Sequence, residues 1–358
     1  TIDGVSRGYN VYYRKTKLNK EYNVNNYVTD SVGGSLSFGY PIDENQSLSA
    51  SIGIDQTKVT TGPSVSTYIR DYLLANGGKA TGSSVRCKSN KYEMDSDNKL
   101  ILDQNGQPKC IGGYDTYDSA FEGEFLTYTL NLGWSYNTLN RPIFPTSGMS
   151  HRVGLEVGIP GSDVDYQKLT YDAQAFMPLW GGCVLRGYGK LGYVTDLPFY
   201  KNFYAGGYGS VRGYDNSSLG PKYPSVIFQK TAQPDQDPEE VGGNALVQFG
   251  TELALPLPFK GDWARQVRPV LFAEGAQVFD NKCDVPGGNN LVNSSNVDIK
   301  QYCKDNYNFN FDNMRYSVGV GFTWITMVGP LSLSYAFPLN DKKGDDTKSI
   351  QFEIGRTF

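Results

Sequence analysis

Apolar and polar residues alternate one by one along several long segments of this chain. The clearest segment places bulky apolar residues on one parity, namely Leu126, Tyr128, Leu130, Leu132, Trp134 and Tyr136. The residues between them are small or polar, and residues 314–324 and 331–338 repeat the arrangement. Successive side chains of a β-strand point to opposite faces, so this period of two predicts strands that are apolar on one face only.

Two classes of protein contain such strands. A soluble β-sandwich turns the apolar face toward a core, whereas a transmembrane β-barrel turns it toward lipid. In this chain the strands run ten or more residues, and aromatic residues stand at or near the ends of the apolar faces, as they do at a membrane interface. No apolar run approaches the roughly 18–20 residues of a membrane helix. The sequence therefore predicts an all-β fold, a transmembrane antiparallel β-barrel.

The alternation divides the chain into twelve predicted strands. They lie near residues 5–16, 28–40, 47–60, 120–137, 148–160, 166–179, 183–195, 243–256, 265–280, 311–326, 328–340 and 349–358. Short connections such as "YPIDENQ", "MPLWGG" and "TMVGP" should lie at one end, and the long connections 61–119, 196–242 and 281–310 at the other. Bacterial barrels have short periplasmic turns and long external loops, so we expect Phe358 in the periplasm.

One short helix is predicted, on the surface within the first long connection. The stretch "GPSVSTYIRDYLLANGG" starts with Pro63 in a first turn and ends at Gly77 and Gly78. Its apolar residues share one helical face, namely Val65, Tyr68, Ile69, Tyr72 and Leu73.

Composition argues against several kinds of chemistry. The chain has 358 residues but a single histidine, His151, which falls on the apolar parity of its strand. No Ser/His/Asp set and no cluster with metal-ligand spacing is apparent, so we expect no enzyme activity, no metal and no cofactor. The net charge of −4 comes from interspersed signs and indicates no nucleic-acid partner.

The five cysteines suit an oxidising compartment. Cys87 and Cys110 lie in one long connection and Cys283 and Cys303 in another, so two local disulfides are the economical pairing. Cys183 remains, at a strand start, and is expected to be a free, buried thiol.

Several segments resemble one family of membrane barrels. "FYAGGYGSVRGY" at 203–214 is followed by "VGGNALVQFGTELALPLPF", "VLFAEGAQVFD", "VGPLSLSYAFPL" and the closing "FEIGRTF". In this order and spacing they resemble the BamA superfamily, outer-membrane barrels that insert or export proteins. The resemblance covers nearly the whole chain.

The resemblance implies an architecture. Barrels of this family have sixteen strands preceded by periplasmic POTRA domains, so residues 1–358 should carry the last twelve strands, without POTRA domains and without the first four strands. "TIDGVS" at the start echoes the turn "PTSGMS" at 145–150, which agrees with strands upstream. The exposed edges 5–16 and 349–358 should then either close on each other or pair with another copy.

The resemblance also assigns a role to the glycine-rich loop. The motif Val211, Arg212, Gly213 and Tyr214 should fold back into the barrel lumen, where Arg212 contacts acidic residues of the wall. Glu252 falls on the inward parity of its strand, and the match adds Glu274, although the strand of Glu274 alternates poorly. The simpler alternative is an exposed arginine in a flexible loop.

The function that the resemblance implies is that of a non-enzymatic insertase in the β-barrel assembly machinery. Its partners would be nascent outer-membrane proteins, accessory lipoproteins bound through the missing POTRA domains, the lipid bilayer and lipopolysaccharide. Client strands would enter at a lateral seam whose last strand here carries Ile350, Phe352, Ile354, Gly355 and Phe358. The alternative is an outer-membrane pore of a two-partner secretion or related translocation system, whose loop carries the same kind of motif.

Overall fold

The computed structural model describes most of the chain. The described residues are 4–18, 27–62, 65–87, 93–94, 101, 109, 111, 114–195, 198–224, 238–257, 266–282, 303–304, 307–327, 329–342 and 344–355. One curved antiparallel sheet dominates, and its strands follow the order β1-β2-β3-β5-β6-β7-β8-β12-β13-β14-β15-β17. Each strand on this path pairs with the next strand of the path, and the path follows the order of the chain, as in a barrel meander.

These twelve strands correspond to the twelve predicted from the alternation. Their bounds are β1 Ser6–Leu18, β2 Tyr27–Pro41, β3 Gln46–Thr61, β5 Tyr114–Asn137, β6 Gly148–Gly158, β7 Gln167–Pro178, β8 Val184–Thr195, β12 Ala245–Ala254, β13 Val267–Phe279, β14 Arg315–Thr326, β15 Gly329–Pro338 and β17 Ile350–Ile354. Another strand, β4 (Lys79–Cys87), pairs with the first part of β5 inside the connection that was predicted as a loop. The connection 61–119 is therefore partly a β-hairpin.

The outward face of the sheet is apolar and the inward face is polar. On β14 the outward residues Val320 and Trp324 are 50% and 44% exposed, whereas the inward Thr323 is 1% exposed. A sandwich would bury the apolar face, so this orientation fits a strand whose apolar side meets lipid. In the described part of the chain, no helix is long and apolar enough to cross a membrane.

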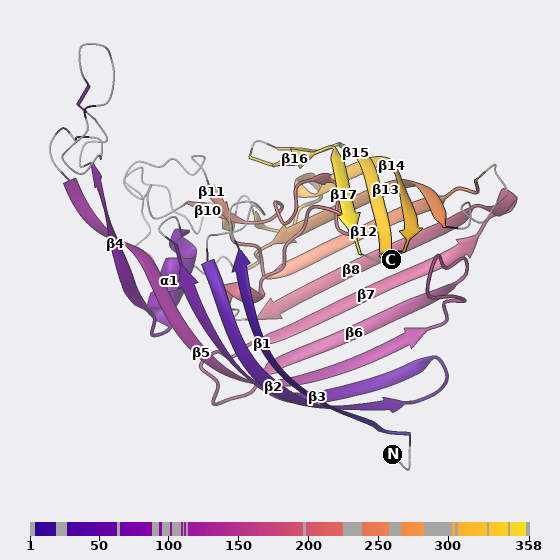
Figure 1. Cartoon of the computed structure of the whole chain (residues 1–358), viewed down its shortest axis with the longest axis horizontal. Coiled ribbons are helices and arrows are strands. Elements are labelled where there is room, and N and C mark those ends of the chain that lie inside the picture. Colours follow the sequence, from indigo (N-terminus) through magenta and orange to yellow (C-terminus); the bar gives the residue numbers. More distant parts are fainter. Residues whose placement is uncertain are drawn as a thin grey trace.

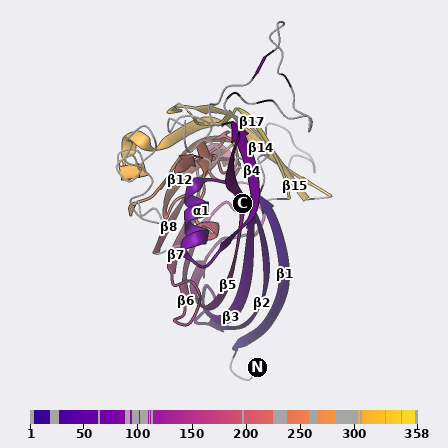
Figure 2. The ribbon, with the colours of Figure 1, turned by 90° about the vertical axis from the view of Figure 1, so that its left-hand side faces the viewer.

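The sheet bends into a deep trough (Figure 1). Figure 2 shows that β1, β2 and β3 form one side and β7, β8 and β12 the other, with α1 inside the curve. Among the described residues, no ladder joins β1 to β17, the two ends of the path. Closure of these two edges on each other, one of the two expected arrangements, is therefore not seen among the described residues.

Helix α1 (Thr67–Ala75) lies against the concave face. The hydroxyl of Ser66 caps it by accepting from the amide of Ile69 at 3.3 Å, so the helix begins after residue 66. The prediction of Pro63 in its first turn was therefore wrong, and Pro63 itself lies outside the described residues. The predicted apolar face is buried, including Val65, which precedes the helix.

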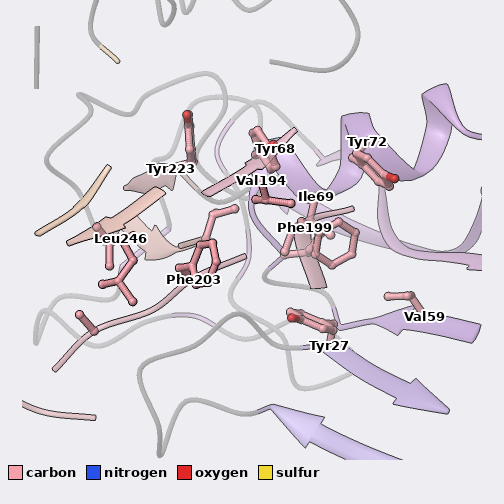
Figure 3. Packing of buried hydrophobic residues seen from close by; sticks show 14 of the residues in the cluster. Tyr27, Val59, Tyr68, Ile69, Tyr72, Val194, Phe199, Phe203, Tyr223 and Leu246 are labelled. Atoms are coloured by element: carbon pink, nitrogen blue, oxygen red, sulfur yellow. The ribbon is translucent and has the colours of Figure 1, made fainter. Parts of the chain in front are cut away.

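The largest hydrophobic core fills the trough between α1, the sheet and the connection after β8 (Figure 3). Phe199 is at its centre, with its ring 5.2 Å from that of Tyr27 and 5.4 Å from that of Tyr72. Tyr68 of the helix stacks on Tyr223 at 5.0 Å. The helix expected on the surface thus packs inward and ties the first long connection to residues 198–224.

Two short ladders hold residues 198–224 inside the trough. β10 (Lys222–Pro224) pairs with β11 (Pro238–Glu240), and β9 (Gly213–Tyr214) pairs with β16 (Thr347–Lys348). The second ladder joins the glycine-rich loop to the segment just before the last strand. Other helical elements include the 3₁₀ turns Trp180–Gly182, Phe199–Lys201 and Phe311–Asn313.

Candidate functional site

The glycine-rich loop reaches the wall of the trough because its backbone turns sharply. Gly206 and Gly213 have φ angles of 103° and 95°, which side chains other than glycine rarely tolerate. A Cβ on Gly206 would lie 2.4 Å from the carbonyl oxygen of Asp215, and one on Gly213 would lie 3.3 Å from Cβ of Ala336. The glycines therefore permit both the turn and the close approach of Arg212 to the sheet.

Arg212 is 2% exposed and contacts two wall carboxylates. Its Nε donates to Oε1 of Glu274 at 2.9 Å, and its Nη2 donates both to that oxygen and, at 2.7 Å, to Oε1 of Glu252. Its backbone amide donates to Oε2 of Glu274 at 2.8 Å. The two predicted partners, on neighbouring strands β12 and β13, thus converge on one side chain.

Two further wall residues complete the site, and the sequence reading missed both. Arg186 on β8 donates through Nη1 to Oε2 of Glu252 at 2.8 Å, and the hydroxyl of Tyr188 donates to Oε1 of Glu274. Two arginines therefore face two glutamates, which balances the buried charge. The ladder places Arg186 directly opposite Glu252, so pairing the predicted strands in register would have found it.

An aromatic ring supports the guanidinium from the wall. The guanidinium carbon of Arg212 lies 3.5 Å from the ring centroid of Phe272, and 5.4 Å from that of Tyr208. Phe272 shares the inward parity of Glu274 on β13, which is the reason that this strand alternates poorly in sequence. The irregularity therefore marks a ring on which the arginine stacks.

The electrostatic environment keeps Arg212 charged. Burial by itself lowers the pKa of its guanidinium, but the carboxylates of Glu274 and Glu252 outweigh this effect and raise that pKa above its ordinary value. Arg212 therefore acts as a permanent cation that bridges two strands.

Beside the cluster lies a cavity of about 290 Å³ on the inward face. Arg152, Asp172, Gln174 and Lys190 line it together with Arg212 and its partners. In the described part of the chain, no group of three or more His, Cys, Asp or Glu residues is arranged to hold a metal ion. The site offers charge pairing and hydrogen bonding.

The rest of the motif is buried. Val211 and Tyr214 are 0% exposed, and the Tyr214 hydroxyl donates to the carbonyl oxygen of Tyr316 at 3.4 Å. Residues 211–214 are thus in contact with the wall on β13, β14 and β15.

The structure describes most of the predicted seam residues. Ile350, Phe352 and Ile354 of β17 are 62%, 54% and 59% exposed on the outward face. Gly355 follows the strand with a φ of 86°, and Phe358 lies outside the described residues. This strand is short, pairing with β15 over five residues.

The cysteine predictions are only partly covered. Cys303 is buried and disulfide-bonded. Cys110 and Cys283 lie outside the described residues, as does the side chain of Cys87, so the two pairings remain predictions. Cys183 is free but only half-buried, because it precedes β8 beside an exposed turn, so its expected full burial was wrong.

The chain is similar to assembly factors of bacteria and to sorting machinery of animals. It is 28% identical over 376 residues to outer membrane protein assembly factor BamA of Neisseria meningitidis serogroup B, covering 100% of this chain and 40% of that protein. It is 25% identical over 252 residues to sorting and assembly machinery component 50 homolog A of Xenopus laevis, covering 66% of this chain and 47% of that protein. The chain thus spans less than half the length of these relatives.

A solved structure and a family model are also similar to this chain over its whole length. The crystal structure of BamA from Haemophilus ducreyi lacking POTRA domains 1–3 superposes with a TM-score of 0.73 at 27% identity, covering 100% of this chain and 60% of that one. The family model described as the Omp85 superfamily domain matches residues 1–358. From the first to the last residue, this chain belongs to the Omp85 superfamily.

Proposed function

We propose that this chain is the membrane barrel of a non-enzymatic insertase, the core subunit of a machinery that folds and inserts outer-membrane β-barrel proteins. The observation that carries the proposal is the similarity along its whole length to barrels named as assembly factors. The outward apolar face and the inward charged cluster are consistent with a membrane protein that acts by binding rather than by bond-breaking chemistry.

In this proposal Arg212 anchors the loop of residues 196–242 as an inward plug. A buried charge is costly unless it is paired, and breaking such a pair costs about 3–5 kcal/mol. The pairing of Arg212 with Glu252 and Glu274 supports a loop whose motif, residues 211–214, is fixed on the wall. Residues 196–197 and 225–237 of this loop lie outside the described residues. The anchored loop would keep its position inside the trough while a client strand pairs with the edge of the sheet.

The client would bind at the last strand. An edge strand presents unpaired N–H and C=O groups, which are a template for an incoming strand. β17 is supported by only a five-residue ladder and carries the apolar outward row Ile350, Phe352 and Ile354. A client strand that added here would continue the lipid-facing surface of the sheet.

The location and partners follow from this role. We propose that the barrel is integral to the bacterial outer membrane, with the long connections outside and the carboxyl terminus in the periplasm. Nascent outer-membrane proteins would be its clients, the bilayer and lipopolysaccharide its surroundings, and accessory lipoproteins would join through segments outside these 358 residues.

Depletion of the whole protein in its own cells tests the proposal. Levels of several unrelated outer-membrane barrels should fall together, and a plasmid copy should restore them. The alternative function, an outer-membrane pore for one secreted partner, predicts normal barrel levels and loss of that single exported protein. That second result would overturn the insertase proposal.

A further inference from the structure

The anchored loop also contacts the segment that begins the last strand. Gly213 and Tyr214 pair with Lys348 and Thr347 in the β9–β16 ladder. The amide of Asp215 donates to the carbonyl oxygen of Asp346 at 2.8 Å. The residue after Arg212 is therefore already bonded to the approach to β17.

Gln351 adds a side-chain contact from the strand itself. It alternates with the exposed Ile350 and Phe352, is 6% exposed and points to the inward side. Its Nε2 donates to the carbonyl oxygen of Tyr214 at 2.6 Å. Among the described residues its Oε1 has no hydrogen-bond partner, so the carbonyl of Tyr214 is what fixes this amide.

The β15–β17 ladder is short where this contact occurs. It joins Leu331–Tyr335 to Ile354–Ile350 and is extended by one bond at each end. The amide of Ala336 donates to the carbonyl oxygen of Ser349 at 2.8 Å, and the amide of Gly355 donates to that of Pro330 at 2.8 Å. The two residues before Ser349, Thr347 and Lys348, pair with β9 instead of β15. Gly213 also lies close to β15 at Ala336, since a Cβ on Gly213 would be 3.3 Å from Cβ of Ala336.

We propose that Gln351 is a positioning residue that, through the carbonyl of Tyr214, fixes the start and the register of the last strand against the Arg212-anchored loop. Arg212 holds residues 211–214 against β12 and β13. Gln351 and the β9–β16 ladder then connect these loop residues to the start of β17. The strand with the shortest ladder on the sheet path thereby gains a second support from the lumen side.

This inference rests on the proposed function in one respect. If clients pair with β17, the contact of Gln351 with the loop sets which residues of that edge face the incoming strand. A shift of one residue would turn Ile350, Phe352 and Ile354 inward, since side chains alternate along a strand. The loop would then influence how a client strand pairs with β17 without contacting the client itself.

Hydrogen exchange tests the contact without any client. Two variants of the whole protein are measured in lipid nanodiscs. Gln351→Leu removes the donor, and Gln351→Glu places a carboxylate against the carbonyl of Tyr214. Amides of residues 346–351 should exchange about tenfold faster or more in both variants, because one buried hydrogen bond is lost. The loop amides of residues 203–211 should keep their protection, since the Arg212 cluster is intact.

Gln277→Leu is the matched control. Gln277 is 5% exposed, lies on the face of β13 opposite to Glu274, and its Nε2 likewise donates to a loop carbonyl, that of Asn308 at 3.0 Å. This variant should leave residues 346–351 unchanged. Arg212→Ala should speed exchange at 346–351, and combining it with Gln351→Leu should add less than the sum of the single effects, because both act through one contact.

The outcomes separate the two proposals. Unchanged exchange at 346–351 in both folded Gln351 variants, or full additivity with Arg212→Ala, would overturn the positioning role whatever the protein does in cells. Faster exchange together with slower client insertion supports the positioning role within the insertase function. Faster exchange with normal insertion by a working insertase would overturn the link between Gln351 and the client edge.

Discussion

Arg212 binds the carboxylate of Glu274 with both its backbone and its side chain. The backbone amide donates to Oε2 at 2.8 Å, and Nε donates to Oε1 at 2.9 Å. One wall residue thus fixes the position of the loop backbone and the direction of the guanidinium together. Glu252 contributes a single contact to Arg212 and shares its charge with Arg186.

Glu274→Gln should therefore weaken the loop anchor more than Glu252→Gln. Loss of the Glu274 charge leaves Arg212 with one shared carboxylate, at a cost of about 3–5 kcal/mol. Loss of the Glu252 charge mainly affects Arg186, whose side chain is 15% exposed and is closer to water. Hydrogen exchange of residues 203–215 measures the difference, and equal protection in the two variants would contradict the ranking.

Phe272→Leu should loosen the site more mildly. It removes the ring 3.5 Å from the guanidinium of Arg212, and a desolvated cation–π contact is worth about 2 kcal/mol. Exchange of the loop amides should rise while the charge pairs persist. Phe322→Leu on the outward face of β14 is the control and should leave the loop unchanged.

Gly206→Ala and Gly161→Ala separate backbone strain from crowding. The two glycines have φ angles of 103° and 101°, but a Cβ at Gly161 meets nothing within 4 Å, whereas at Gly206 it meets the carbonyl of Asp215. Both variants should incur about 1–2 kcal/mol of strain, and only Gly206→Ala should also release the loop. Limited proteolysis of residues 203–220 checks this, and equal cleavage in the two variants would exclude crowding as the cause.

Peptide mapping without reductant should find Cys87 joined to Cys110 and Cys283 joined to Cys303. Each bond closes a local loop and should contribute about 3 kcal/mol in the simple chain-entropy model. Cys183 should react with a thiol reagent, slowly because it is half-buried. A peptide that links Cys183 to any other cysteine would contradict this pairing.

The alternation in sequence predicted the strand path because most of the twelve strands have one apolar and one polar face. It did not predict β4, since Lys79–Cys87 is small and polar and has no apolar parity to detect. It also did not predict how short the last strand is. Residues 347–348 lie just before the predicted strand 349–358, and they form a short strand of their own because the folded loop brings residues 213–214 beside them.

The charged site was partly predictable. The parity of Glu252 on β12 put its side chain inside, and the family motif supplied Arg212 and Glu274. Arg186 and Tyr188 were not predicted, because their place in the site depends on the register between β8 and β12. Gln351 escaped for a different reason, since its partner is a backbone carbonyl and leaves no trace in side-chain pattern.

The most direct test of the whole account is client insertion by purified protein. In proteoliposomes, the protein should speed the folding of an unrelated, denatured outer-membrane barrel, followed by its heat-modifiable mobility on a gel. Arg212→Ala should lose most of this acceleration while its own barrel stays folded. Arg268→Ala, which removes an inward arginine bonded instead to the carbonyl of Pro145, should retain it. Normal insertion by Arg212→Ala, with its loop shown to be released, would contradict the account.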